Sequence, residues 1–313
     1  MLLLLAAALP SVLWDAPADT APALREAGIT RISVPPARMG AWQKAEGISV
    51  TAANLEGAVK LDAPSVDYRI NRGGATSAPW LNSNGWTILR QPHARFLYDV
   101  KGPQAALAAA EAFTFGAEAM VRTDAAGLKP LAAMLEFLHS LPEADLPSVS
   151  DIGFVDDGTD VAGEVMNMMI RDNLLFRIVA PSDRSGKVTV RLGSPEYPAA
   201  DAQDPTWAAH EVRARLTDDR RSLRVYGSQV VVARLYGAGG RVRVALLNYA
   251  GAERKVNGIR VRVLGQFPGH KLAVAGDPNA ELTDYAADAD ATEFTLPELK
   301  TYAVIDLQKE SKR

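Results

Sequence analysis

Short apolar runs alternate with helix-like stretches through the first 180 residues, and this alternation is typical of parallel βα units. The first unit is the clearest, because a strand at 11–14 leads into a helix at 20–27, Gly28 ends that helix, and the next strand covers 30–34. The same pattern predicts further strands at 48–51, 86–89, 95–100, 118–122, 151–156 and 175–180, with helices at 103–115, 128–141 and 161–173.

Two architectures fit this order of elements. The count of about eight strands suits a closed (β/α)8 barrel. The segment PEADLP at 142–147 interrupts the pattern, however, and favours a second arrangement. In that arrangement an incomplete TIM barrel ends near residue 146, and a small flavodoxin-like α/β unit with a helix at 205–216 occupies residues 148 to about 225.

The chain changes character from residue 223 onward, where β-branched runs are separated by Gly, Asn, Pro and Asp turns. This pattern predicts a C-terminal antiparallel β-sandwich, with a pair of strands within 223–236 and others at 241–248, 258–264, 271–275, 291–296 and 301–307. The expected domains are therefore a TIM-like βα region at 13–146, a βα continuation or small α/β domain at 147–222, and the sandwich at 223–313.

The N-terminal residues 1–13 form an apolar run with the length of a signal-peptide core, too short to span a bilayer. No Lys or Arg precedes the run, so a first buried strand that follows a clipped leader or a misassigned start is the alternative. We interpret residues 1–12 as a possible signal-peptide remnant. A secreted or periplasmic protein is expected on that interpretation, and a cytoplasmic one otherwise.

Composition narrows the function classes. The 34 Lys and Arg residues against 37 Asp and Glu residues give a net charge of −3, which argues against nucleic-acid binding. The absence of cysteine excludes disulfides, thiolate metal sites and cysteine nucleophiles, and the four His residues are scattered. The acidic turn at 156–160 lacks the spaced ligands of a calcium loop, and no Walker, GxGxxG or GxSxG motif is present. Neither an organic cofactor nor a metal is expected.

Candidate acids lie where predicted parallel strands end, because that edge of a barrel carries the functional groups. Asp99 and Asp124 form the best pair, since each follows an apolar run and Tyr98 and Arg122 lie beside them. Glycosidic bond cleavage needs two such carboxyl groups. The alternative for both residues is helix capping. The other acids at predicted strand ends are Asp15, Asp156 and Asp157.

A polar segment at 71–85, rich in Gly, Pro and Asn, is the most loop-like part of the first half of the chain. Sugar rings pack their C–H faces on aromatic planes, while their hydroxyl groups need amide and guanidinium partners. Alternatively, the two tryptophans of this region anchor the loop to the rim of the barrel. The residues of the carbohydrate-facing set are Trp80, Asn82, Asn84, Trp86 and Arg90.

This order of a TIM-like region followed by a β-sandwich resembles glycoside hydrolases of the barrel superfamily. The resemblance is carried by Leu13-Trp14-Asp15, by the segment 82–86 and by Phe96-Leu97-Tyr98-Asp99. Residues 151–180 are also similar to the amidotransferase-like domain that follows the barrel in some β-galactosidase-type enzymes. The Asn-Glu pair that the largest clan carries after its fourth strand is absent from the sequence.

The resemblance implies a carbohydrate-active protein that cleaves glycosidic bonds of an oligo- or polysaccharide, with Asp99 as nucleophile or base and Asp124 as acid. The alternative is a catalytically inactive carbohydrate-binding or structural protein on a degenerate barrel. A raised pKa at one of the two carboxyl groups would favour the enzyme. The oligomeric state is left open. The expected substrate-binding residues are Trp14, Asp15, Trp80, Asn82, Asn84, Trp86, Arg90 and Tyr98.

Overall fold

The computed structural model describes residues 9–68, 79–143, 145–251 and 253–310. Most of the expected leader and residues 71–78 of the expected loop therefore lie outside the described residues. The chain divides into two compact units, one formed by residues 5–65 and 91–144 and the other by residues 66–90 and 145–313. We call them the parallel-sheet unit and the C-terminal unit, and each is described by itself.

The parallel-sheet unit contains one six-stranded sheet in the order β3-β2-β1-β8-β7-β4, and its strand pairs are all parallel. This is the cyclic order of a barrel, opened between β3 and β4. Its strands are β1 (Ser11–Leu13), β2 (Arg31–Val34), β3 (Ser49–Ala52), β4 (Val59–Leu61), β7 (Arg95–Asp99) and β8 (Glu118–Arg122).

Chain connectivity requires this sheet to be strongly curved. Residues 53–58 join its two edge strands, β3 and β4. In a flat sheet of six strands the two edge strands would lie about 24 Å apart. A six-residue connection spans about that distance only when it is fully extended, and this one must also run back along the strands, because β3 and β4 point in the same direction. Arg95 of β7 fastens the connection by donating to the carbonyl oxygens of Asn54 at 3.1 Å and Glu56 at 2.8 Å. The sheet is therefore an open, curved sheet of barrel-like order.

The outer face of this sheet carries the apolar side chains. Phe96 and Tyr98 of β7 and Val121 of β8 are buried, whereas the alternating positions Asp99 and Arg122 are not. The alanine-rich helix α4 (Gln104–Phe115) packs against β8 and α5 (Leu128–Ser140). The shorter helices of this unit are α1 (Ala21–Glu26) and α2 (Met39–Trp42).

A second, three-stranded parallel sheet lies in the C-terminal unit, with β9 (Ile152–Val155) between β10 (Phe176–Ile178) and β11 (Val188–Arg191). Its helices are α6 (Asp160–Arg171) and α7 (Pro205–Leu216), which pack on each other. The strands expected at 151–156 and 175–180 thus pair within this sheet and do not continue the six-stranded one. The closed eight-stranded barrel is therefore not the arrangement of the described residues.

The strand expected at 86–89 is wrong, because this segment lies within helix α3 (Gly85–Arg90). The Ser83 hydroxyl accepts a hydrogen bond from the Gly85 backbone N–H at 3.1 Å, and the Asn84 carbonyl accepts from Ile88 at 3.0 Å. These bonds begin a helix, and they outweigh the strand-like composition of Trp-Thr-Ile-Leu. Before it, β6 (Trp80–Asn82) pairs with β5 (Ser65–Asp67).

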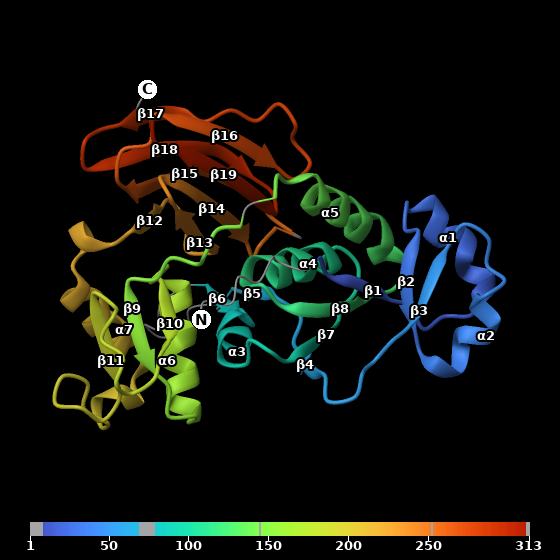
Figure 1. The fold of residues 1–313 in the computed structure, drawn as a ribbon, viewed down its shortest axis with the longest axis horizontal. Helices are drawn as coiled ribbons and strands as arrows, with labels where there is room; N and C mark the ends of the chain where they lie inside the picture. The colour runs from blue at the N-terminus through green and yellow to red at the C-terminus, as the bar shows by residue number, and fades with distance from the viewer. Residues whose placement is uncertain (1–8, 69–78, 144, 252, 311–313) are drawn as a thin grey trace. The chain divides into compact units, whose positions relative to one another are not determined.

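The rest of the C-terminal unit consists of two four-stranded antiparallel sheets, which Figure 1 shows in orange to red. One has the order β12-β15-β18-β17 and the other β13-β14-β19-β16. One hydrophobic cluster contains buried side chains from both sheets, among them Ile259, Phe294 and Ile305. The strands are β12 (Leu223–Tyr226), β13 (Val231–Ala238), β14 (Arg241–Asn248), β15 (Val256–Leu264), β16 (Gly269–Val274), β17 (Thr283–Ala287), β18 (Ala291–Leu299) and β19 (Tyr302–Gln308).

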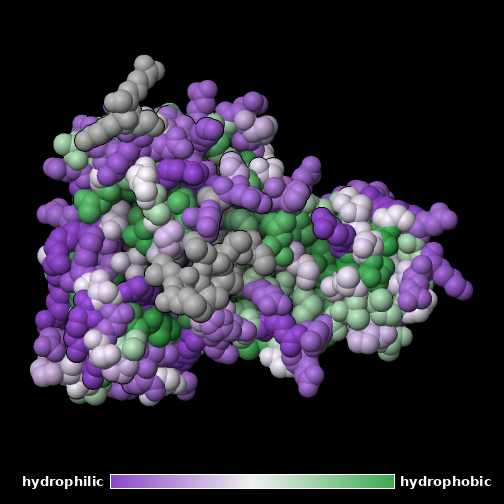
Figure 2. Space-filling view, in the orientation of Figure 1, coloured by the Kyte–Doolittle hydropathy of each residue, from purple (hydrophilic) through white to green (hydrophobic). Residues whose placement is uncertain are grey.

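The exposed large hydrophobic side chains of the C-terminal unit are scattered at Tyr68, Tyr226 and Leu264. Figure 2 shows hydrophilic side chains over most of the visible surface of its antiparallel sheets. Scattered apolar residues of this kind are ordinary on a protein surface and mark no docking patch. Within the described residues, no helix has both the length and the apolar character needed to cross a bilayer.

Candidate functional site

Three charged side chains meet where strands of the six-stranded sheet end. Asp99 is the last residue of β7, Arg122 is the last of β8, and Asp15 follows β1. Because β8 lies between β1 and β7 and the strands are parallel, their carboxyl ends meet at one edge of the sheet. The Arg122 guanidinium donates to Asp15 Oδ2 at 3.2 Å and to Asp99 Oδ2. We call Asp15, Asp99 and Arg122 the edge site.

A row of register-paired residues continues from the edge site across the sheet, with the buried apolar Leu13 between its charged residues and its hydroxyl-bearing residues. The strand register pairs Asp99 with Arg122, Arg122 with Leu13, Leu13 with Ser33 and Ser33 with Thr51. The Ser33 and Thr51 hydroxyl oxygens lie 3.1 Å apart and share a hydrogen bond. Four inter-strand steps of about 4.8 Å make this row about 19 Å long. Charged groups occupy one end of it and hydroxyl groups the other.

Asp99 is held in its ionised form. The hydrogen bond from Arg122 lowers the pKa of Asp99 below its ordinary value, and the positive charges of Arg122, Lys60 and Lys101 act in the same direction. The same hydrogen bond raises the pKa of Arg122. The Asp99 carboxylate can therefore accept hydrogen bonds from a ligand or act as a base or nucleophile, but it does not hold a proton to donate.

Asp124 makes the contacts of a helix cap. Its Oδ1 atom accepts from the backbone N–H groups of Gly102 at 2.9 Å and Gly127 at 3.0 Å. These bonds, that of Gly102 first, lower the pKa of Asp124. Gly127 precedes α5, so Asp124 helps to begin that helix. Neither Asp99 nor Asp124 has the raised pKa that a general acid needs near neutral pH.

The two aromatic residues expected at this edge lie in the core. Tyr98 is fully buried, and its hydroxyl donates to Glu111 Oε2 at 2.8 Å. Trp14 is also buried, and its Nε1 atom donates to Thr20 Oγ1 at 2.9 Å. Since both rings are buried, neither presents a platform on which a sugar ring could stack.

The other expected binding residues belong to the C-terminal unit, where Trp86 and Arg90 of α3 face α6. The Arg90 guanidinium binds both carboxylate oxygens of Asp156 at 2.8 Å and lies 5.1 Å from the centre of the Trp86 ring. A Cβ atom placed on Gly163 of α6 would come within 2.9 Å of that ring. These contacts fasten α3 to α6 within the C-terminal unit.

Trp80, Asn82 and Asn84 likewise make contacts within the protein. The Arg171 guanidinium lies 4.3 Å from the centre of the Trp80 ring, and Asn82 Nδ2 donates to Asp67 Oδ2 at 3.0 Å. Asn84 is buried. The expected substrate-binding set is thus divided between the two units, and only Asp15 contributes to the edge site together with Asp99.

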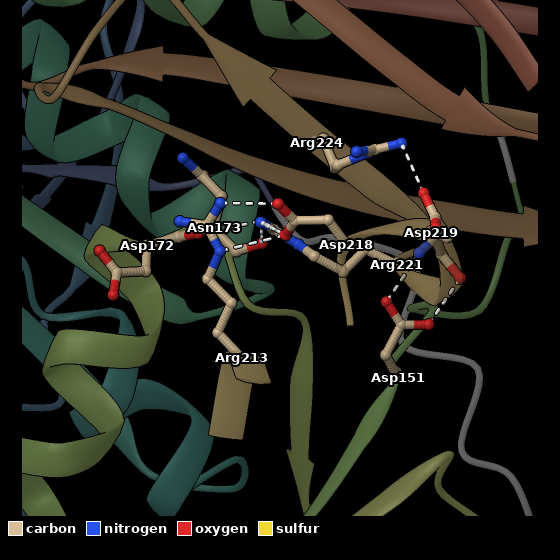
Figure 3. Close-up of polar contacts among 9 residues, drawn as sticks. Asp151, Asp172, Asn173, Arg213, Asp218, Asp219, Arg221 and Arg224 are labelled. Carbon is tan, nitrogen blue, oxygen red and sulfur yellow. Dashed lines mark hydrogen bonds and ion pairs between the residues drawn. The ribbon is translucent and has the colours of Figure 1, made fainter. Parts of the chain in front are cut away.

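A partly buried polar network that the sequence did not reveal lies in the C-terminal unit (Figure 3). Arg221 is 5% exposed and donates to Asp218 and to the carbonyl oxygens of Asp172 and Asn173. Hydrogen bonds from Arg213 and then Arg221 lower the pKa of Asp218 to about 2, whereas burial raises the pKa of Asp172. Because these bonds satisfy groups of the protein itself, the network holds the fold together.

No family model matches the sequence, and no curated protein matches it. Among solved structures, the chain is similar to α-L-fucosidase isoenzyme 2 from Paenibacillus thiaminolyticus, with a TM-score of 0.53 and 11% identity over 71% of this chain. The matched part of the chain shares the fold of the corresponding part of this fucosidase. It spans 62% of the fucosidase chain.

Two further matches have lower TM-scores. They are a noncanonic maltogenic α-amylase from Thermotoga neapolitana (TM-score 0.25, 8% identity, 96% of this chain and 99% of that chain) and a glycoside hydrolase family 30 xylanase from Clostridium acetobutylicum (TM-score 0.24, 10% identity, 96% and 95%). In the part of the chain that the structure describes, no group of three or more His, Asp or Glu side chains is placed to hold a metal ion.

Proposed function

We propose that this chain binds carbohydrate at the edge site of its six-stranded sheet. The observation that carries the proposal is the single guanidinium of Arg122 between the carboxylates of Asp15 and Asp99 at the strand ends. Sugar hydroxyl groups donate to carboxylates and accept from guanidinium groups, so this edge offers both kinds of partner. The fold shared with an α-L-fucosidase supports a carbohydrate as the ligand class.

The lowered pKa values of Asp99 and Asp124 favour a protein that binds carbohydrate without hydrolysing it. Hydrolysis of a glycosidic bond requires a protonated carboxyl group as acid and an ionised one opposite it. The pKa of Asp99 and that of Asp124 are both lowered, the first by Arg122 and the second by backbone hydrogen bonds. Two carboxylates of this kind hold a ligand but supply no proton to a leaving group.

A glycoside hydrolase is the second candidate, and the position of Asp99 favours it. Asp99 and Asp15 end strands on either side of β8, at the edge where barrel enzymes carry their catalytic groups. In this reading Asp99 acts as nucleophile or base. The proton would come from Asp124, as the sequence predicts.

A combined screen tests the proposal and separates the two candidates. The purified protein is incubated with soluble polysaccharides, oligosaccharides and aryl glycosides, and both thermal shift and reducing-end release are measured on each sample. Binding without release supports the proposal, whereas release that is lost in Asp99→Asn supports the hydrolase. Asp124→Asn is the matched control for binding, since asparagine also caps helices, and loss of release in this variant as well would assign Asp124 the role of the acid. The absence of both a thermal shift and reducing-end release would contradict both candidates.

We also propose that residues 223–313 form the expected β-sandwich and serve as a packing domain. The hydrophobic cluster shared by the two antiparallel sheets supports this. The boundaries near 146 and 222 and the export of the protein remain predictions. Limited proteolysis tests the boundaries, because cleavage should concentrate at exposed connections between domains.

A further inference from the structure

A cavity of about 180 Å³ lies in the parallel-sheet unit, apart from the three side chains of the edge site. Strand β1 contributes Ser11 to its wall, β2 contributes Ser33, β7 contributes Arg95, and β8 contributes Glu118 and Met120. The connection that follows β3 closes one side with Ala53 and Asn54.

The polar groups of this wall are of mixed character and are available to a ligand. Within the described residues, neither the Ser11 hydroxyl nor the Glu118 carboxylate has a hydrogen-bond or ion-pair partner. Arg95 donates to two backbone carbonyl groups, and among the residues that the structure describes no ion pair joins it to a carboxylate. The wall therefore presents a carboxylate acceptor, a guanidinium, an amide and hydroxyl groups around one small space.

The remaining wall is apolar and suits the C–H face of a sugar ring. Ala53 and Met120 supply methyl and thioether groups on the same cavity. A small site with an apolar surface and a few fixed polar groups is the usual form of a ligand pocket. The hydrogen bonds of Arg95 and Ser33 hold these groups in place before any ligand binds.

The cavity lies next to the edge site. The register pairs Ser11 with Met120 and Leu13 with Arg122, so the cavity row is two residues, about 7 Å, nearer the amino ends of the strands. Ser33 belongs both to the row of residues that continues from the edge site and to the cavity wall. A sugar chain bound along the edge could thus place one unit in the cavity.

We propose that this cavity is a binding site for one neutral monosaccharide unit, an inference that rests on the proposed carbohydrate function. A neutral polyol uses donors and acceptors together, as this wall provides. Because Arg95 and Glu118 line the same small space, the carboxylate of an acidic sugar that pairs with Arg95 also lies near Glu118, and the ammonium group of an amino sugar that pairs with Glu118 also lies near Arg95. Both carry a repulsion that the neutral sugar avoids.

Isothermal titration with D-glucose, D-galactose, L-fucose, D-xylose and D-glucuronate tests the site, with neutral oligosaccharides titrated in parallel. At least one neutral monosaccharide should bind better than glucuronate. Glu118→Gln should weaken that binding about tenfold, because it removes a charged acceptor. Ser11→Leu should abolish it by filling the space. Glu143→Gln, an exposed glutamate of the same unit outside the cavity wall, is the matched control.

The outcomes separate this inference from the proposed function. The cavity site is refuted if oligosaccharides bind and monosaccharides do not. It is also refuted if both cavity variants still bind the monosaccharide. Neither result contradicts the edge site. Monosaccharide binding that the cavity variants lose, with no oligosaccharide binding, supports the cavity and refutes the extended edge site. If neither class of sugar binds, both proposals fail.

Discussion

Replacing Asn173 tests how the three-stranded parallel sheet and its helices are joined to the antiparallel sheets of the C-terminal unit. The Asn173 side chain lies in the turn after α6 and bonds to strand β13 like a neighbouring strand. Its Nδ2 atom donates to the Val231 carbonyl at 3.0 Å, and its Oδ1 atom accepts from the Ala233 N–H at 2.6 Å. Its backbone is in the left-handed region, with φ of 53°.

The expected cost follows from these contacts. Val231 and Ala233 are 1% and 2% exposed, so the groups that Asn173→Ala leaves unpaired have little access to water. Each such group costs about 1–3 kcal/mol, and the left-handed backbone adds about 1 kcal/mol for alanine. Asn173→Ala should therefore lower the free energy of unfolding by about 3–7 kcal/mol. Asn173→Gly should cost about 1 kcal/mol less, because glycine tolerates this backbone.

Urea unfolding followed by circular dichroism measures these differences, and amide hydrogen exchange at Ala233 shows where protection is lost. Asn257→Ala, at an exposed position of β15, is the matched control and should change stability by less than about 0.5 kcal/mol. A cost below about 1 kcal/mol for Asn173→Ala would refute the reasoning. Equal costs for alanine and glycine would refute the backbone contribution.

Three further predictions concern single contacts. Asp124→Ala should cost about 1 kcal/mol in thermal unfolding, while Asp124→Asn keeps the cap; equal losses would contradict a capping role. Asp218, whose pKa is about 2 against an ordinary 3.8, stabilises the fold above about pH 4, and this contribution is lost as the pH falls toward 2. Its side chain is 38% exposed, so solvent screening reduces the contribution to about 1 kcal/mol. The measurement is the difference in urea stability between wild type and Asp218→Asn, which should be present at pH 6 and should vanish near pH 2. A difference that does not change with pH would refute the ion pair with Arg213. Gly163→Ala should cost about 1–3 kcal/mol, because the new methyl group would press on the Trp86 ring, and no change in urea midpoint would contradict this packing.

Elements with strong local signals could be predicted from the sequence. Helix α7 matches the predicted range of 205–216, because Asp204 caps it and Pro205 suits its first turn. The six parallel strands were found in part, since β4 is three residues long and was not recognised. The segment 86–89 has the β-branched and aromatic composition of a strand, but the hydroxyl of Ser83 begins a helix there.

The candidate site could be predicted from local sequence patterns only in part. Asp15 and Asp99 were found because each follows a predicted strand. Their junction through Arg122 depends on β8 lying between β1 and β7, and strand order is a property of the folded sheet. The bond between Asn173 and Val231 joins residues 58 positions apart, and a buried amide of this kind leaves no periodic signal.

The central claim is that Asp99 and Arg122 bind carbohydrate at the edge of the six-stranded sheet. The most direct test is isothermal titration of the tightest oligosaccharide from the screen into wild type, Asp99→Asn and the control Asp124→Asn. The account predicts that Asp99→Asn weakens binding about tenfold, since a charged hydrogen-bond acceptor is lost, and that the control binds as wild type does. Wild-type affinity in Asp99→Asn, or no oligosaccharide binding by the wild type, would contradict it.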